Sequence, residues 1–182
     1  MLRAIERSQT LHDFDEPLEM LAACHERIEA QLSTLERLVE HLATKGCDAD
    51  ARTAAQSVIR YFDTSGALHH QDEDEDLFPL VRVHAARLGR PDAAAAIEEL
   101  EREHETMERQ WKRLREELTA VAAGEGRIDA ENVVRFAWLY RRHMDREGAL
   151  VLPFAKCILD AAQLAALGER MIARRKVPTT RA

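Results

Sequence analysis

The chain lacks long apolar runs, and it has few aromatic residues and few cysteines. No stretch approaches the roughly 18 to 20 consecutive apolar residues of a membrane-spanning helix, so we expect a soluble protein with no membrane partner. Only 5% of the residues are aromatic, and apolar residues recur every three or four positions rather than every two, which argues against β-strands. These absences predict an all-α protein.

The three cysteines, Cys24, Cys47 and Cys157, lie far apart in the sequence, and their number is odd. They form no CxxC pair, and we recognise no secretory signal. Reduced thiols and a cytoplasmic location are therefore expected.

The charged residues do not form a basic patch. The net charge is −7 with acidic and basic residues interspersed, whereas a nucleic-acid-binding surface needs a clustered basic face. We therefore expect an ion or a small molecule as the partner, and no nucleic acid. With 182 residues, 46% of them apolar, the chain is long enough for a single domain with a substantial core.

Apolar stripes and helix start signals predict four long helices and a short fifth one. The long helices are expected to begin near Pro17, Asp48, Pro91 and Asp129, where acidic residues and prolines favour helix N-termini. The short helix covers Asp160 to about Lys176. Short turns favour antiparallel neighbours, so we expect an antiparallel up-down-up-down four-helix bundle with a short C-terminal fifth helix.

This architecture divides the chain into three parts. Residues 1–14 form an N-terminal segment, residues 15–159 form the four-helix bundle, and residues 160–182 form the C-terminal helix and tail. The last six residues are too few and too polar to fold alone.

Two segments of the chain repeat one pattern. HHQDEDEDLFP starts at His69, and HMDREGALVLP starts at His143. Both place a glutamate four residues after the histidine and a proline six residues after the glutamate. Residues four apart lie on the same face of a helix, so each segment directs an imidazole and a carboxylate the same way. We expect Pro79 to kink its helix and Pro153 to kink or end its own.

Helical counting also predicts which side chains near the repeats face inward. Steps of three and four from the histidines place Leu77 and Leu80 on the inner face of the second helix, and Leu150 on that of the fourth. These positions follow from an uninterrupted α-helical period.

Two further histidines interrupt apolar stripes, His25 in the first helix and His104 in the third. A single histidine on an apolar face is more often hydrogen-bonded into the core than bound to a metal. Four imidazoles and two carboxylates buried at one level, however, would cost several kcal/mol without a cation. We therefore predict a metal site with six ligands: His25, His69, Glu73, His104, His143 and Glu147.

Imidazole and carboxylate ligands without a thiolate suit iron or manganese, with zinc as a further alternative. If Glu73 and Glu147 bridge two ions and two histidines bind each, every ion has about four protein donors. Iron takes five or six ligands, so positions would stay open for oxygen, peroxide or water. The expected cofactor is a pair of iron ions.

Several other residues compete for a place in this site. His70 lies about 100° around the helix from the first ligand of its repeat, so it is expected to face a neighbouring helix, a supporting residue or solvent. Glu29 and Glu108 follow site histidines by four residues but lie off the apolar stripes, which favours surface charge or support of a ligand. Glu108 is an outside candidate for direct ligation. Tyr140 either hydrogen-bonds a group at the metal or binds an ordinary backbone partner.

The remaining histidines and charged residues have simpler interpretations. We expect structural or exposed positions for His12, His41 and His84, which lie outside the pattern. Cys24 should turn away from the ligand face and pack. The acidic run Asp72–Asp76 is expected to be a solvated face that also attracts cations.

Four motifs together resemble the hemerythrin-like HHE cation-binding domain family: CHERIE around His25, HHQDEDEDLFP, EREHETME around His104, and HMDREGALVLP. The likeness covers roughly Asp15 to Phe154. It implies a four-helix bundle with a non-haem di-iron centre, in which the six predicted ligands occupy the family's ligand positions. The oxygen-carrying hemerythrins place a second histidine four residues after the ligand of the third helix, where this chain has Glu108. This difference argues against simple reversible oxygen carriage.

The resemblance implies a protein that binds or reacts with a small diatomic ligand, such as oxygen or nitric oxide, or with peroxide. Whether it is an enzyme stays open. The alternative is a non-enzymatic iron or oxygen sensor that acts through a protein partner of unknown identity. A metal-free helical adaptor is the third hypothesis.

Overall fold

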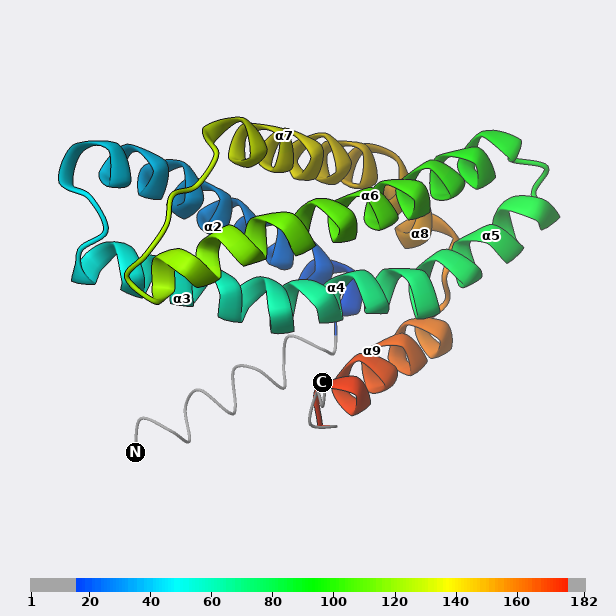
Figure 1. The fold of residues 1–182 in the computed structure, drawn as a ribbon. Helices are drawn as coiled ribbons and strands as arrows, with labels where there is room; N and C mark the ends of the chain where they lie inside the picture. Colours follow the sequence, from blue (N-terminus) through cyan, green and yellow to red (C-terminus); the bar gives the residue numbers. More distant parts are fainter. Residues whose placement is uncertain (1–15, 177–182) are drawn as a thin grey trace. The chain divides into compact units, whose positions relative to one another are not determined.

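The computed structural model describes residues 16–176 (Figure 1), so the predicted N-terminal segment and the last six residues lie outside it. The described part is almost entirely helical and contains no β-strand, which confirms the all-α class. No helix within residues 16–176 is long and apolar enough to pass through a membrane. The elements in chain order are α2 (Pro17–Lys45), α3 (Ala49–Tyr61), η2 (Phe62–Gly66), α4 (Ala67–Asp72), η3 (Glu73–Leu77), α5 (Phe78–Arg87), α6 (Pro91–Ala122), α7 (Ala130–Arg146), η4 (Glu147–Val151), α8 (Leu152–Ile158) and α9 (Ala161–Lys176).

The helix ends follow the start and stop signals of the sequence. Asp48 caps α3, its carboxylate accepting a hydrogen bond from the backbone N–H of Ala51 at 3.0 Å. Asp129 caps α7 through the N–H of Glu131 at 2.9 Å. Gly46 follows α2 with a φ of 79°, which glycine adopts without steric strain. The predicted helix limits at these positions are confirmed.

The described residues form two compact units. Unit 1 contains the described residues up to His25, the segment Leu68–Glu99, and the described residues from Arg146 onward. Unit 2 contains Glu26–Ala67 and Leu100–Asp145. The antiparallel order of the four long helices and the limits of the bundle stay predictions.

Unit 2 has an apolar core with an aromatic centre. Phe62, Phe136 and Tyr140 pack with ring centroids between 4.8 and 5.4 Å apart. Trp111 packs against Phe62 with the two rings tilted by 40°, and its indole N–H donates to Asp63 at 3.0 Å. Further buried side chains of this core come from α2, α3, α6 and α7, and include Ile28, Leu32, Leu35, Ala55, Val58, Met107 and Leu118.

Unit 1 buries apolar side chains from the elements that flank the two repeats. Within it, α8 lies against α5, and α9 lies against η3. Leu167 and Met171 on α9 are fully buried, as the amphipathic pattern of the predicted fifth helix requires. Other buried apolar residues of this unit include Leu18, Leu21, Phe78, Val81, Ile97, Val151 and Ala155.

Each repeat contains a π-helical turn that was not predicted. The turn η3 begins at Glu73 and η4 begins at Glu147, the glutamates of the two repeats. The N–H of Phe78 donates to the carbonyl of Glu73, and the N–H of Leu152 donates to that of Glu147, five residues back in each case. A proline follows each donor, at the start of a new helix, where its missing N–H costs little. The helices therefore continue past both prolines.

The π-turns change which side chains face inward. Leu150, predicted to lie inside, is 55% exposed, and the next residue, Val151, is buried instead. Leu80, also predicted inside, is only partly buried, whereas Val81 is fully buried. One extra residue in a turn rotates the residues that follow by about 100°, so the helical counting was wrong at Leu150, within η4, and at Leu80, after η3.

Candidate metal centre

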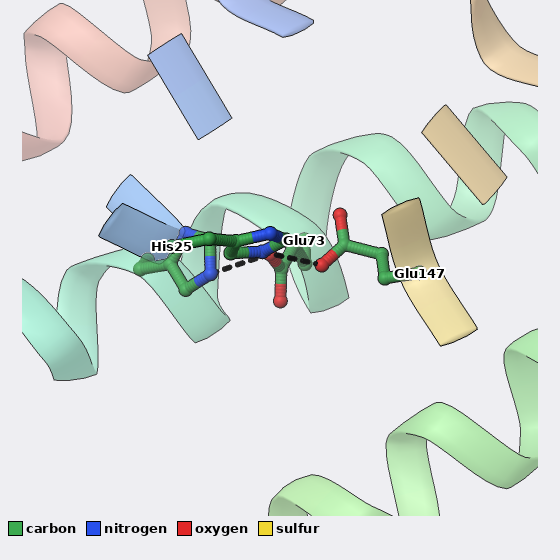
Figure 2. A group of neighbouring side chains, drawn as sticks. His25, Glu73 and Glu147 are labelled. Atoms are coloured by element: carbon green, nitrogen blue, oxygen red, sulfur yellow. Dashed lines mark ion pairs between the residues drawn. The ribbon is translucent and has the colours of Figure 1, made fainter. Parts of the chain in front are cut away.

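Unit 1 brings four of the six predicted ligands together. His25 comes from α2 and His69 from α4, while Glu73 and Glu147 are the first residues of η3 and η4. One donor atom from each of these side chains lies within 4.8 Å of those of the other three. Figure 2 shows His25, Glu73 and Glu147 directed toward one another. The cluster therefore presents two imidazoles and two carboxylates to one small volume.

The contacts within this cluster are short but poorly aligned. Nε2 of His25 lies 2.8 Å from Oε2 of Glu147 (Figure 2), and Nε2 of His69 lies 2.9 Å from Oε1 of Glu73. Among the described residues, Nε2 of either histidine and the carboxylate oxygens of Glu147 find no hydrogen-bond partner of normal geometry. Buried nitrogen and oxygen atoms that converge without aligning as donor and acceptor fit a set of ligands around a cation.

The cluster holds charge away from solvent. The side chains of Glu73 and Glu147 are fully buried, and that of His69 is 1% exposed. Burial opposes protonation of His69, but the negative charges of Glu73 and Glu147 outweigh it and raise the pKa of His69 well above its ordinary value. The carboxylates thus attract positive charge strongly even here. A divalent cation would supply more of that charge than one proton does.

Cys24 precedes His25 on α2 and is buried, as the prediction of a packing role requires. Its side chain lies near enough to His69 to favour protonation of that imidazole. The thiol is not one of the four gathered donors.

Unit 2 brings the other two predicted ligands together. His104 on α6 and His143 on α7 are both buried, and their Nε2 atoms lie 3.1 Å apart. Their ring centroids are 4.6 Å apart. Two imidazole nitrogens at this distance either share one N–H···N hydrogen bond or direct two lone pairs at a cation.

His143 also has a buried carboxylate neighbour that was not predicted. Oε2 of Glu103 lies 3.2 Å from Nδ1 of His143, and Oε1 of Glu103 lies 3.0 Å from Nη2 of Arg142. A signal for this residue was present in the sequence. Glu103 lies three residues after Leu100 and four before Met107, which are both fully buried, so it shares their face of α6.

Three other candidates are not among the gathered donors. Glu29 accepts a hydrogen bond from Arg141 at 2.7 Å. Glu108 is 57% exposed and pairs with Lys112 at 3.0 Å, which confirms surface charge as its role and gives no support for direct ligation. Tyr140 is buried in the aromatic core of unit 2.

The remaining histidines lie outside the donor groups as well. His70 is half-buried with its ring centroid 5.9 Å from that of His69. His41 contacts the aspartate that caps α3 at 2.8 Å, and His84 hydrogen-bonds Gln163 at 3.1 Å. These contacts confirm structural roles for both. His12 lies outside the described residues.

The prediction that the acidic run Asp72–Asp76 is a solvated face is wrong for two of its residues. Asp72 is fully buried, and Asp76 is nearly so. Arg175 of α9 contacts Asp72 at 2.6 Å, and Arg174 contacts both Asp72 and Asp76. Burial is the strongest influence on Asp72 and raises its pKa, although both arginines act to lower it. The helix that carries His69 and Glu73 is therefore held by arginines of α9.

The donors in both units are of the types that bind borderline and hard metal ions. Imidazole nitrogens and carboxylate oxygens suit iron, manganese and zinc. The unaligned contacts in unit 1 and the close Nε2 atoms in unit 2 both fit donors arranged for a cation.

Comparison with known proteins tests this interpretation. A family model described as the hemerythrin HHE cation binding domain matches residues 16–155. The chain belongs to this family. All six predicted ligands of this hemerythrin-family chain lie within the matched segment, so the predicted family is confirmed. The chain is also similar to an uncharacterized protein of Haemophilus influenzae, with 32% identity over 171 residues that cover 93% of this chain and 95% of the relative. Family and donor geometry together support metal binding.

Proposed function

We propose that this hemerythrin-family protein binds two iron ions and that the loaded centre binds or reacts with oxygen, peroxide or nitric oxide. The proposed ligands are His25, His69, Glu73, His104, His143 and Glu147. The observation that carries the proposal is the convergence of four buried donor side chains in unit 1 within 4.8 Å. Manganese and zinc are alternatives that the same donors allow.

The duplicated sequence pattern supports two ions rather than one. Along the sequence, His143 and Glu147 are four residues apart, as are His69 and Glu73, so each repeat offers one imidazole and one carboxylate. A carboxylate has two oxygens and can bind one ion with each. Bound iron would supply reversible redox chemistry and open coordination positions.

The surrounding residues would hold these donors in place. The carbonyls of Glu73 and Glu147 accept from Phe78 and Leu152 across the π-turns, which anchors the backbone at both glutamates. Cys24 is buried close to His69. The full burial of both carboxylates keeps bulk water from competing for them.

A non-enzymatic sensor is a second candidate, favoured by the contacts of α9. Asp72 directly precedes Glu73 and binds Arg174 and Arg175 of that helix. A change at Glu73 on metal loading or oxidation would shift Asp72 and therefore the position of α9. The shift would alter a surface to which a protein partner could bind. The identity of that partner and a cytoplasmic location stay predictions.

Metal analysis of the purified protein tests the proposal. After expression in iron-rich medium, we expect two iron ions per chain and near-ultraviolet absorption from ferric iron. Added peroxide should be consumed over many turnovers by an enzyme, whereas a sensor should show only a stoichiometric spectral change. Protein that carries no metal under these conditions would contradict the proposal and favour the adaptor hypothesis.

A further inference from the structure

His143 is a predicted ligand whose two ring nitrogens both have buried neighbours within unit 2. Nδ1 lies 3.2 Å from Oε2 of Glu103, and Nε2 lies 3.1 Å from Nε2 of His104. An ionised carboxylate only accepts hydrogen bonds, so Nδ1 of a neutral His143 must carry the ring proton and donate a hydrogen bond to Glu103. The lone pair of that imidazole is then on Nε2, the atom that faces His104.

The other oxygen of Glu103 is also engaged. Oε1 lies 3.0 Å from Nη2 of Arg142, whose guanidinium carbon lies 5.2 Å from the centre of the Trp138 ring. The side chain of Glu103 is 10% exposed, and that of Arg142 is 45% exposed. One carboxylate therefore interacts with a buried imidazole through one oxygen and with a half-exposed cation through the other.

We propose that Glu103 is a positioning residue that holds His143 in the tautomer with an unprotonated Nε2 and sets how strongly this nitrogen donates to a metal. Arg142 weakens the effect of Glu103 on His143, because its positive charge partly neutralises the same carboxylate. The inference rests on the proposed function, since it takes His143 as a ligand. A carboxylate that accepts from the far nitrogen of a metal-binding imidazole fixes the ring and raises the basicity of the near nitrogen.

An ordinary surface ion pair between Glu103 and Arg142 does not account for this geometry. Glu108, five residues further along α6, forms such a pair with Lys112, and both of those side chains are more than half exposed. Glu103 is instead turned inward against His143. The two glutamates share residue type and helix, so Glu108 is a matched control for Glu103.

The experiment compares Glu103→Gln, Arg142→Gln and Glu108→Gln in the iron-loaded protein by iron affinity and midpoint potential. Glu103→Gln should lower affinity about 10- to 100-fold and raise the potential, because His143 donates less electron density. Arg142→Gln should lower the potential, because Glu103 then acts fully on His143. Glu108→Gln should match the wild type in both measurements. Opposite shifts from the first two variants are not expected of a merely structural contact.

A second measurement reads the tautomer of His143 without metal. Proton–nitrogen correlation spectra of the metal-free wild type should show its Nδ1 protonated, and Glu103→Ala should lose that preference. Unchanged affinity and potential in Glu103→Gln, or shifts of the same sign in Glu103→Gln and Arg142→Gln, would overturn the inference while the proposed function stands. If Glu103→Gln does not fold, the half-exposed Arg142 still gives the sign of the shift. A wild type that binds no iron would overturn both proposals.

Discussion

Unit 1 and unit 2 bury their predicted ligands in different surroundings. In unit 1, Glu73 and Glu147 are fully buried beside two histidines, and the neighbouring Asp72 is buried against arginines of α9. In unit 2, His143 of the histidine pair contacts Glu103, within a unit whose core is apolar and aromatic. Unit 1 therefore has the more highly charged interior.

This difference indicates which unit depends more on a bound cation. Buried carboxylates that converge repel one another and lack solvent, so unit 1 contains a destabilising cluster unless positive charge is present. Unit 2 gains its stability mainly from burying apolar area, which does not depend on metal. Metal should therefore matter more to the order of unit 1 than to that of unit 2.

The largest expected effect comes from removing one of the proposed ligands in unit 1. His69→Ala should lower iron affinity by more than about 100-fold, because changes to residues that only support a ligand already cost about 10- to 100-fold. The melting temperature should fall with the metal content. Elemental analysis checks the first effect and calorimetry the second. His84→Ala, a histidine of α5 that only hydrogen-bonds Gln163, is the matched control and should retain iron. Retained iron in His69→Ala would contradict the ligand assignment.

Metal removal tests whether unit 1 depends on a bound cation more than unit 2 does. After chelation, backbone amides of α4 and η3 should lose hydrogen-exchange protection, because the proposed ligands His69 and Glu73 would lose the cation between them. Amides of α3, in unit 2, should keep most of theirs. Exchange measured by mass spectrometry on loaded and chelated protein distinguishes the two. Equal loss in both units would mean that they do not differ in their dependence on metal.

A core substitution in unit 2 tests whether the stability of this unit comes from apolar burial rather than from metal. Phe136→Ala should lower the free energy of unfolding by about 3–5 kcal/mol, because the ring is fully buried in the aromatic centre. Denaturant unfolding measures this loss. Val134→Ala, on the same helix and 64% exposed, should change stability by no more than about 0.5 kcal/mol. Folded Phe136→Ala should still bind iron, and loss of iron from it would contradict a separation of roles.

The smallest expected effect concerns a surface network of unit 2. Hydrogen bonds from Arg141 lower the pKa of both Glu29 and Glu36 below 4.5. The folded state therefore binds protons less tightly there, so the network stabilises the protein above about pH 4.5 and stops doing so as pH falls through the lowered values. All three side chains are partly exposed, so Arg141→Gln should cost less than about 1 kcal/mol at pH 7. Unfolding curves should show this difference shrinking as pH falls below 4.5, and a difference that persists in strong acid would indicate packing rather than charge.

The sequence predicted the features that depend on regular spacing. Helix limits at Asp48 and Asp129 follow from side chains that cap a helix end, which act locally. The pairing of His69 with Glu73 follows from the α-helical period, and the repeat at His143 identified the second copy. These inferences needed no knowledge of tertiary contacts.

The features that were missed depend on contacts between elements or on a local change of period. The π-turns at Glu73 and Glu147 shifted the helical register, which is why Leu150 was wrongly placed inside. The burial of Asp72 requires the arginines of α9, about a hundred residues away in the sequence. Glu103 has the residue type expected on the exposed face of an amphipathic helix. Its spacing from Leu100 and Met107, however, places it on the buried face.

The most direct test of the central claim is a crystal structure of the iron-loaded protein with anomalous data collected at the iron edge. Two anomalous peaks are expected, each about 2 Å from nitrogen or oxygen atoms of the six proposed ligands. Peaks elsewhere, or no peak beside His25, His69, Glu73 and Glu147, would contradict the claim.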